Sequence, residues 1–194
     1  MKNLFLLSII AVFAIGSVNA QDDSTGGFTG GDIYVSGSVG FNSTKTGDAK
    51  SNEFTFSPSV GYFISDNIAL EASLLIGSSE DAGDNKTSSF GGGLGANYFF
   101  TPDSQFSFIL GAGLVYVNSK LEPNGGGEAK TNTFAASVRP GLNYFVSDAF
   151  ALRASIAALS YSSSKPDFSG ADATNNFGLN VDFSDINFGV IYKF

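Results

Sequence analysis

The sequence predicts an all-β chain, an eight-stranded antiparallel up-and-down β-barrel, on three observations. Eight segments alternate apolar residues with polar or small ones at a period of two, which is typical of a strand with two different faces. Beyond the first fifteen residues, no apolar run is long enough for a membrane-crossing helix. The connections between the eight segments alternate between short and long, as they do in a barrel of consecutive hairpins.

The N-terminus reads as a secretory signal peptide. Lys2 precedes an apolar stretch over residues 4–15, and Val18 and Ala20 stand two positions apart before the expected cleavage site. The apolar stretch is too short for a transmembrane helix. We therefore predict a signal peptide over 1–20, a short N-terminal segment over 21–30 and the barrel over 31–194.

The first four predicted strands each carry an apolar face opposite a face of mainly Ser, Thr, Gly and Asn. In the first of them, Val35, Val39 and Phe41 share one face, and the alternate positions hold Tyr, Ser and Gly. Strict alternation of this kind indicates a strand between two different environments. The four strands are Asp32–Asn42, Glu53–Ile64, Ile68–Gly77 and Ser89–Phe100.

The last four predicted strands are less regular. The fifth carries apolar residues such as Val115 on the face that is otherwise small, and the seventh loses its alternation at residues 157–159. The eighth changes phase along its length, which predicts a bulge near Ser184 and Asp185. These strands are Phe106–Val117, Thr133–Val146, Phe150–Ser160 and about Asn176–Phe194.

The connections suggest that the two ends of the barrel differ. Three are tight turns, and the other four are longer, polar and rich in Gly, Asn and Lys. The tight turns are 65–67, 101–105 and 147–149, and the long loops are roughly 43–52, 78–88, 118–132 and 161–175. Short turns at one end and long loops at the other are typical of membrane barrels.

An internal repeat places aromatic residues at one level. Val60–Ser73 and Leu142–Ser155 match at eight of fourteen positions, and each segment is a strand, a tight turn and a strand. The repeat puts Tyr62, Tyr98 and Tyr144 on the apolar face near the tight turns, as an interfacial aromatic girdle requires. The Phe that follows each Tyr would point inward. The alternative is that these Tyr-Phe pairs form the core of a soluble sandwich.

The chain ends in an alternating segment with an aromatic last residue. Phe188, Val190, Tyr192 and Phe194 form a continuous apolar stripe. This segment resembles the C-terminal strand by which bacterial outer-membrane β-barrels are recognised by their assembly machinery. With the signal peptide and the repeated Tyr-Phe-x-Ser-Asp turns, the whole chain resembles the small eight-stranded outer-membrane barrels related to the OmpA transmembrane domain and OmpX.

The resemblance implies where the chain works and what it contacts. It implies a transmembrane barrel in the bacterial outer membrane, with periplasmic short turns and extracellular long loops. Outer-membrane lipids and the barrel-assembly machinery are the partners that it implies, and the expected state is a monomer.

Composition excludes several function classes. The chain has no His and no Cys, so the commonest ligands of transition metals and the usual activator of a nucleophile are missing. We therefore predict no enzyme activity, no metal and no cofactor. The acidic net charge of −8 argues against nucleic acid as a partner. The segment Asp81–Asp84 lacks the oxygen-ligand spacing of a calcium loop.

Three charged residues fall on the face that would line the lumen: Glu71, Arg139 and Arg153. Glu71 and Arg153 occupy the same position in the two repeat copies, so we expect them to meet across the barrel, with Arg139 close enough to join them. Charges in such an interior are normally paired. The primary interpretation is a structural ion-pair network, and the alternative is an anion-selective constriction or gate.

A second pair is predicted at the seam of the barrel. Asp32 and Lys193 both face inward on the first and last strands, which must be neighbours if the barrel closes. The alternative is two separately solvated rim charges.

The function that these features favour is structural or surface-interacting. Exposed loops on a rigid barrel could mediate adhesion or defence, while the barrel supports membrane integrity. The first alternative is a narrow, passive, porin-like channel. A soluble carrier resembling lipocalins is disfavoured, because the aromatic-rich stripe faces outward in every predicted strand.

Overall fold

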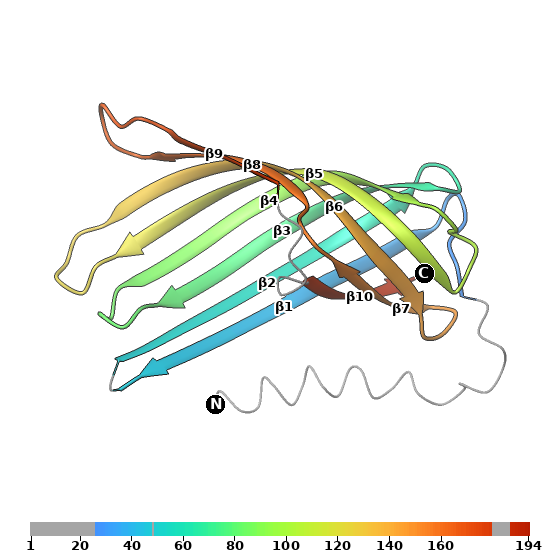
Figure 1. Cartoon of the computed structure of the whole chain (residues 1–194), viewed down its shortest axis with the longest axis horizontal. Helices are drawn as coiled ribbons and strands as arrows, with labels where there is room; N and C mark the ends of the chain where they lie inside the picture. Colours follow the sequence, from blue (N-terminus) through green and yellow to red (C-terminus); the bar gives the residue numbers. More distant parts are fainter. Residues whose placement is uncertain (1–25, 48, 180–186) are drawn as a thin grey trace.

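The computed structural model describes residues 26–47, 49–179 and 187–194, and these form an antiparallel barrel (Figure 1). The predicted signal peptide and the bulge predicted near Ser184 lie outside the described residues. Among the described residues there is no helix long and apolar enough to cross a membrane.

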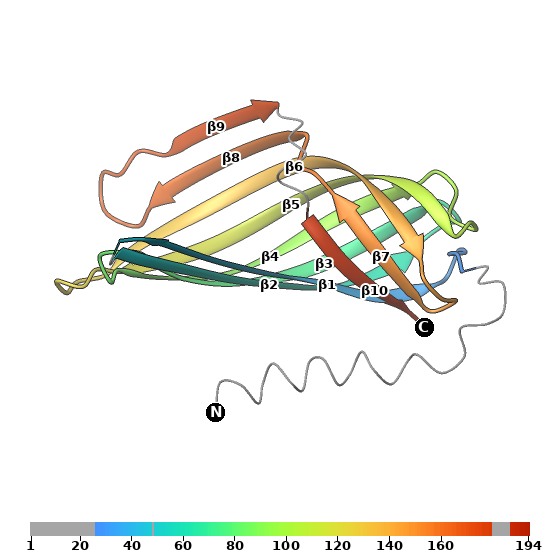
Figure 2. The same ribbon diagram turned by 60° about the horizontal axis from the view of Figure 1, so that its bottom comes forward.

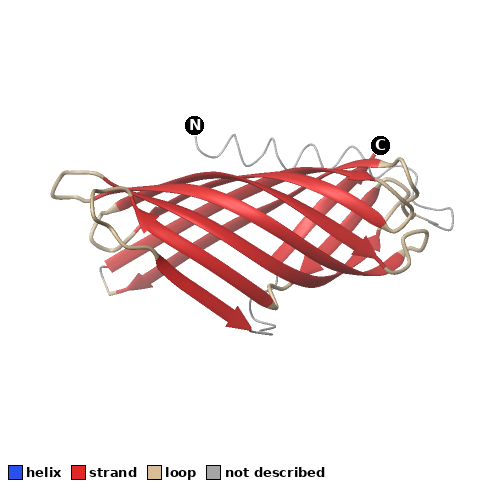
Figure 3. Ribbon diagram, turned by 90° about the horizontal axis from the view of Figure 1, so that it is seen from above, coloured by secondary structure: helices blue, strands red, loops and turns tan. Residues whose placement is uncertain are grey.

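Ten strand segments follow the eight predicted strands. The predicted seventh strand is divided in two, the predicted eighth is described as two segments on either side of residues 180–186, and the first six are continuous. The segments are β1 (Ile33–Thr46), β2 (Ala49–Phe63), β3 (Ile68–Glu80), β4 (Lys86–Phe99), β5 (Phe106–Glu122), β6 (Ala129–Phe145), β7 (Phe150–Ser155), β8 (Leu159–Pro166), β9 (Thr174–Leu179) and β10 (Asn187–Lys193). They run obliquely around the barrel (Figure 3).

The segments pair in the order of consecutive hairpins, with β8 pairing β9 beyond the bulge, and the first segment pairs with the last. β1 to β6 pair consecutively, β7 and β8 both pair with β6, and β10 joins β7 to β1. At the closing seam Tyr34 lies opposite Lys193, and Gly37 lies opposite Val190. The predicted closed, eight-stranded, up-and-down barrel is confirmed.

A bulge separates β7 from β8 where the sequence loses its alternation. Ser155 pairs with Gly141, and Leu159 pairs with Val138, so three residues face two on β6. Ile156 donates to the carbonyl of Pro140 at 3.1 Å, so the side of Pro140 that lacks an N–H faces the bulge. The extra residue moves the apolar face from even positions in β7 to odd positions in β8. Figure 2 shows β8 and β9 side by side, on the other side of the bulge from β7 and β10.

The barrel has two different ends, which we call the turn end and the hairpin end. The turn end carries the connections 64–67, 100–105 and 146–149. At the hairpin end the strands continue well into the predicted long loops, so that prediction of the strand ends was wrong. Polar side chains there do not end the ladder, because the backbone hydrogen bonds between paired strands continue whatever the side chains are. The remaining connections are 47–48, 81–85, 123–128 and 167–173.

The two faces of the barrel have opposite polarity. Outward-facing Leu94, Tyr116 and Phe134 are 42–69% exposed, as are most large apolar side chains of the strands. The side chains that point into the lumen are mostly Ser, Gly, Thr and Asn, except near the turn end. This arrangement matches a lipid environment outside and a polar interior.

Candidate functional site

An aromatic plug fills the lumen at the turn end. We use this name for five rings that are 0–1% exposed: Phe28, Tyr34, Phe63, Phe99 and Phe145. The ring of Phe28 lies at the centre. Its centroid is 4.6 Å from that of Phe63, 4.9 Å from that of Phe145 and 5.3 Å from that of Phe99. The prediction that the three Phe of the Tyr-Phe pairs point inward is confirmed.

The segment that carries Phe28 is tied to the turns around it. The Phe28 N–H donates to the carbonyl of Pro102 at 2.6 Å, and the Gly30 N–H donates to Oδ1 of Asp66 at 3.0 Å. A Cβ on Gly27 would lie 2.7 Å from the carbonyl carbon of Asp103, so only glycine allows this close approach. Phe28 is therefore held in the lumen by both backbone and side-chain contacts.

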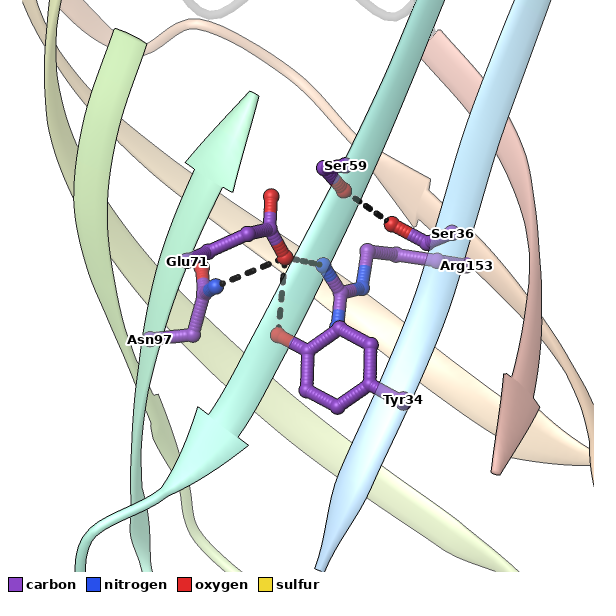
Figure 4. A network of polar contacts seen from close by, with 6 residues as sticks. All are labelled: Tyr34, Ser36, Ser59, Glu71, Asn97 and Arg153. Atoms are coloured by element: carbon purple, nitrogen blue, oxygen red, sulfur yellow. Dashed lines mark hydrogen bonds and ion pairs between the residues drawn. The ribbon is translucent and has the colours of Figure 1, made fainter. Parts of the chain in front are cut away.

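A buried ion pair lies next to the aromatic plug (Figure 4). Nη1 of Arg153 on β7 donates to Oε2 of Glu71 on β3 at 2.9 Å, and the two side chains are only 13% and 17% exposed. The Tyr34 hydroxyl donates to the same oxygen at 2.7 Å, and Nδ2 of Asn97 donates at 3.3 Å. The guanidinium also lies 5.4 Å from the centroid of the Tyr34 ring. Three donors thus compensate one buried carboxylate oxygen.

Gly61 makes room for Tyr34. These residues are directly opposite on β2 and β1, and the ring of Tyr34 occupies the space that a Cβ on Gly61 would need. A side chain at this position would push the ring away from Glu71. Packing an aromatic ring over a cross-strand glycine is a recognised stabilising device in sheets.

We expect Gly61→Ala to lower the free energy of unfolding by about 1–3 kcal/mol, because the added methyl group overpacks a filled site. The measurement is a guanidinium titration of the barrel in phospholipid vesicles. Gly92→Ala is the matched control, since a Cβ on this strand glycine meets its nearest atom at an ordinary 3.5 Å. Equal stability of the two variants would contradict the role given to Gly61.

Arg139 does not join the ion pair, which differs from the prediction. Among the described residues it makes no ion pair, and the three donors to Oε2 of Glu71 come from Arg153, Tyr34 and Asn97. Its Nη2 instead lies 3.1 Å from the position of a Cβ on Gly113, over the glycines of β5. The guanidinium therefore faces the lumen beside the ion pair.

A cavity of about 370 Å³ with both polar and aliphatic lining residues continues from the ion pair toward the hairpin end. Seven serines line it together with Glu71, Asn97, Arg139 and Arg153. The serines are Ser36, Ser38, Ser57, Ser59, Ser73, Ser137 and Ser155. Their side chains are partly exposed, so solvent reaches the cavity. The lumen is thus open and partly polar toward the hairpin end, and apolar and filled at the turn end.

The structure brings Asp32 and Lys193 together at the seam. Nζ of Lys193 lies 3.9 Å from Oδ2 of Asp32 and donates to the carbonyl of Gly27 at 2.5 Å. The same carboxylate oxygen accepts from the Thr29 N–H at 2.9 Å. This pair therefore connects the first and last strands to the segment that carries Phe28.

The outer surface near the turn end is ringed by aromatic side chains. Tyr62, Tyr98 and Tyr144 point outward and are 43–50% exposed. The terminal strand adds to the ring, because Tyr192 contacts both Phe150 and Phe194 at centroid distances of 4.9 and 5.0 Å. Phe188 also faces outward from β10 and is 69% exposed, and Val190 lies on the same face.

The hairpin end is polar and internally cross-linked. Lys120 pairs with Glu122 at 2.7 Å and with Glu128 at 2.9 Å, and the Asn124 N–H donates to Oδ1 of Asn85 in the neighbouring hairpin at 3.1 Å. In the connection 81–85, hydrogen bonds from Asn85 and the Gly83 N–H lower the pKa of the Asp81 carboxyl below its usual range. Lys120 and Lys130 lower the pKa of Glu128 in the same way. Hydrogen bonds and ion pairs therefore link the residues of these connections to one another.

Sequence reasoning missed Phe28, Tyr34 and Asn97. Tyr34 was visible as the one aromatic residue on the polar face of its strand, directly before Val35. Phe28 stands alone between two Gly-Gly pairs, at positions 26–27 and 30–31, and this isolation was its only signal. In the part of the chain that the structure describes, no group of three or more acidic, His or Cys side chains could hold a metal ion.

Comparisons with known proteins agree with this geometry. The family model described as "Outer membrane protein beta-barrel domain" matches residues 8–194. No curated protein matches the sequence. Among solved structures, the N-terminal β-barrel domain of OprF from Pseudomonas aeruginosa is similar with a TM-score of 0.53 and 18% identity, covering 86% of this chain and 100% of that one.

Two further solved structures share the fold. Neisserial surface protein A has a TM-score of 0.54 and 17% identity, covering 84% of this chain and 97% of its own. The outer membrane protein OprG from Pseudomonas aeruginosa has a TM-score of 0.54 and 15% identity, covering 89% and 99%. At these identities the similarity establishes the fold and no more.

Proposed function

This chain belongs to the outer membrane protein β-barrel domain family, and on that premise we propose that it is a non-conducting surface barrel of the bacterial outer membrane. Its role would be to support the membrane and to present ordered hairpins to partners outside the cell. The turn end would face the periplasm and the hairpin end the exterior. The absence of His and Cys from the sequence supports a role without catalysis.

The observation that carries this proposal is the filled turn end of the lumen. The five rings of the aromatic plug are 0–1% exposed, and the Glu71–Arg153 pair lies against them. Eight-stranded barrels have interiors just wide enough to be filled by side chains. A hydrated ion would have to displace these rings to cross the lumen.

A passive, anion-selective channel is the second candidate, and the cavity of about 370 Å³ with its two arginines favours it. Single-channel recording in planar bilayers separates the two candidates. We expect no steady current from the wild-type barrel. Phe28→Ala combined with Phe99→Ala is the matched control, since it removes two rings of the aromatic plug and should let current pass. A steady wild-type current that is anion-selective and is lost in Arg139→Gln would favour the channel.

The surface role needs its own measurement. The polar hairpin formed by the ends of β5 and β6 carries the Lys120–Glu128 ion pair and is the longest continuous ladder at this end. Shortening this hairpin should reduce adhesion of cells to host or abiotic surfaces while leaving dye uptake unchanged. The matched control alters only the connection 146–149 at the turn end. Unchanged adhesion in every hairpin variant would argue against surface interaction.

A further inference from the structure

Among the described residues, the side chains that line the lumen cavity carry a net positive charge. Its charged lining residues are one carboxylate, Glu71, and two guanidinium groups, Arg139 and Arg153. Oε2 of Glu71 lies 2.9 Å from Nη1 of Arg153, whereas Arg139 makes no ion pair with any described residue. Low-dielectric walls concentrate the field of such a charge inside the cavity. The wall therefore attracts an anion.

The arginines also keep unused donors. A guanidinium has five N–H donors, and Nε and Nη2 of Arg153 are buried without a hydrogen-bond partner among the described residues. Nη2 of Arg139 extends over Gly113, where the small residues of β5 leave the guanidinium accessible from the cavity. Guanidinium groups bind carboxylate and phosphate oxygens through two parallel hydrogen bonds. Arg139 is thus placed to anchor an oxyanion.

The polar part of the remaining wall suits hydroxyl groups, and aliphatic residues such as Leu75 and Ile109 complete it. Seven serine side chains line the cavity, and among them only Ser36 and Ser59 hydrogen-bond to each other. A hydroxyl both donates and accepts, so serines such as Ser57 and Ser137 can bind the hydroxyls of a sugar. The volume of about 370 Å³ also exceeds what an inorganic anion needs. It falls within the range of roughly 300–1,000 Å³ typical of small-molecule sites.

We propose that this cavity binds a small hydroxylated oxyanion, of the class of sugar phosphates and sugar acids, with Arg139 on the anionic group and the serines on the hydroxyls. The ligand enters from the hairpin end, since the aromatic plug closes the other end. The site is thus a binding site for an extracellular solute and requires no conduction.

The test is isothermal titration calorimetry on the folded barrel in detergent micelles. Glucose 6-phosphate is the main probe, and inorganic phosphate and glucose are separate arms that divide anion from hydroxyl recognition. We expect glucose 6-phosphate to bind most tightly, phosphate more weakly and glucose weakest. Arg139→Gln should weaken the binding of glucose 6-phosphate by about tenfold or more. Ser57→Phe, which fills the cavity and keeps both arginines, should weaken it as well.

Lys165→Gln is the matched control, since it removes the same charge from an exposed position outside the cavity. Its binding should equal that of the wild type. Equal binding by Arg139→Gln, or no binding by the wild type, would overturn the proposal. Phosphate that binds as tightly as glucose 6-phosphate would overturn the part that assigns the serines. The calorimetry needs no membrane, so its result is independent of the current recordings that test the proposed function.

Discussion

Replacing Arg153 with methionine should lower the free energy of unfolding of the barrel by about 3–5 kcal/mol, the usual cost of removing one partner from a buried ion pair. Glu71 would keep its hydrogen bonds from Tyr34 and Asn97 but would lose its only ion pair among the described residues. Glu71 is only 17% exposed, so the water that reaches the cavity solvates its carboxylate only in part and does not replace the guanidinium. The large effect comes from the charge left behind rather than from the net strength of the pair.

Two further variants test that reasoning. Arg153→Met combined with Glu71→Gln should recover most of the lost stability, because a neutral amide at position 71 needs no counter-charge. Lys130→Met removes a cation from the exposed pair with Glu128, 3.1 Å apart at the hairpin end, and should change stability little because water and salt screen that pair. Guanidinium titrations in phospholipid vesicles measure all three. No recovery in the double variant would show that the arginine acts by packing and not by charge.

The strands could be predicted because lipid and lumen impose opposite polarity on alternate residues. The pattern fixed the facing of Val35, Val39 and Phe41 in β1 without any structural information. Beyond the end of the apolar stripe the alternation gives no signal, although the backbone hydrogen bonds between strands continue. The alternation therefore predicts the end of β5 at Val117, whereas the strand continues to Glu122. The position of the bulge opposite Pro140 could not be predicted either. It depends on whether β5 or β7 faces the side of Pro140 that lacks an N–H.

The site could be predicted only in part, and the reason is again physical. Equivalent positions in the repeat placed Glu71 and Arg153 at one height, and a barrel this narrow brings them together. The direction in which a long side chain extends is not set by such an argument. Arg139 lies over Gly113 rather than at Glu71, because the small residues of β5 offer it space there. Side chains that enter the lumen from outside the barrel strands, such as Phe28, follow no strand periodicity at all.

Replacing Phe28 with alanine should lower the free energy of unfolding by about 3–5 kcal/mol, since a fully buried phenylalanine is lost from a packed aromatic cluster. The rings of Phe63, Phe99 and Phe145 are held by barrel strands and cannot move in to fill the space, so most of the cavity should remain. The three partners each lose a ring contact at a centroid distance of 4.6–5.3 Å. Such contacts add about 0.5–1.5 kcal/mol each beyond the area that they bury.

The matched control is Phe168→Ala in the connection 167–173, where the ring is 67% exposed and its removal leaves no cavity. Guanidinium titrations of both variants in vesicles give the comparison, and the control should stay within about 0.5 kcal/mol of the wild type. Phe28→Leu should recover much of the loss, because it refills most of the volume without an aromatic ring. If Phe28→Ala is as stable as the control, the segment before β1 does not support the barrel. The stability of the turn end would then depend only on the rings that the strands themselves supply.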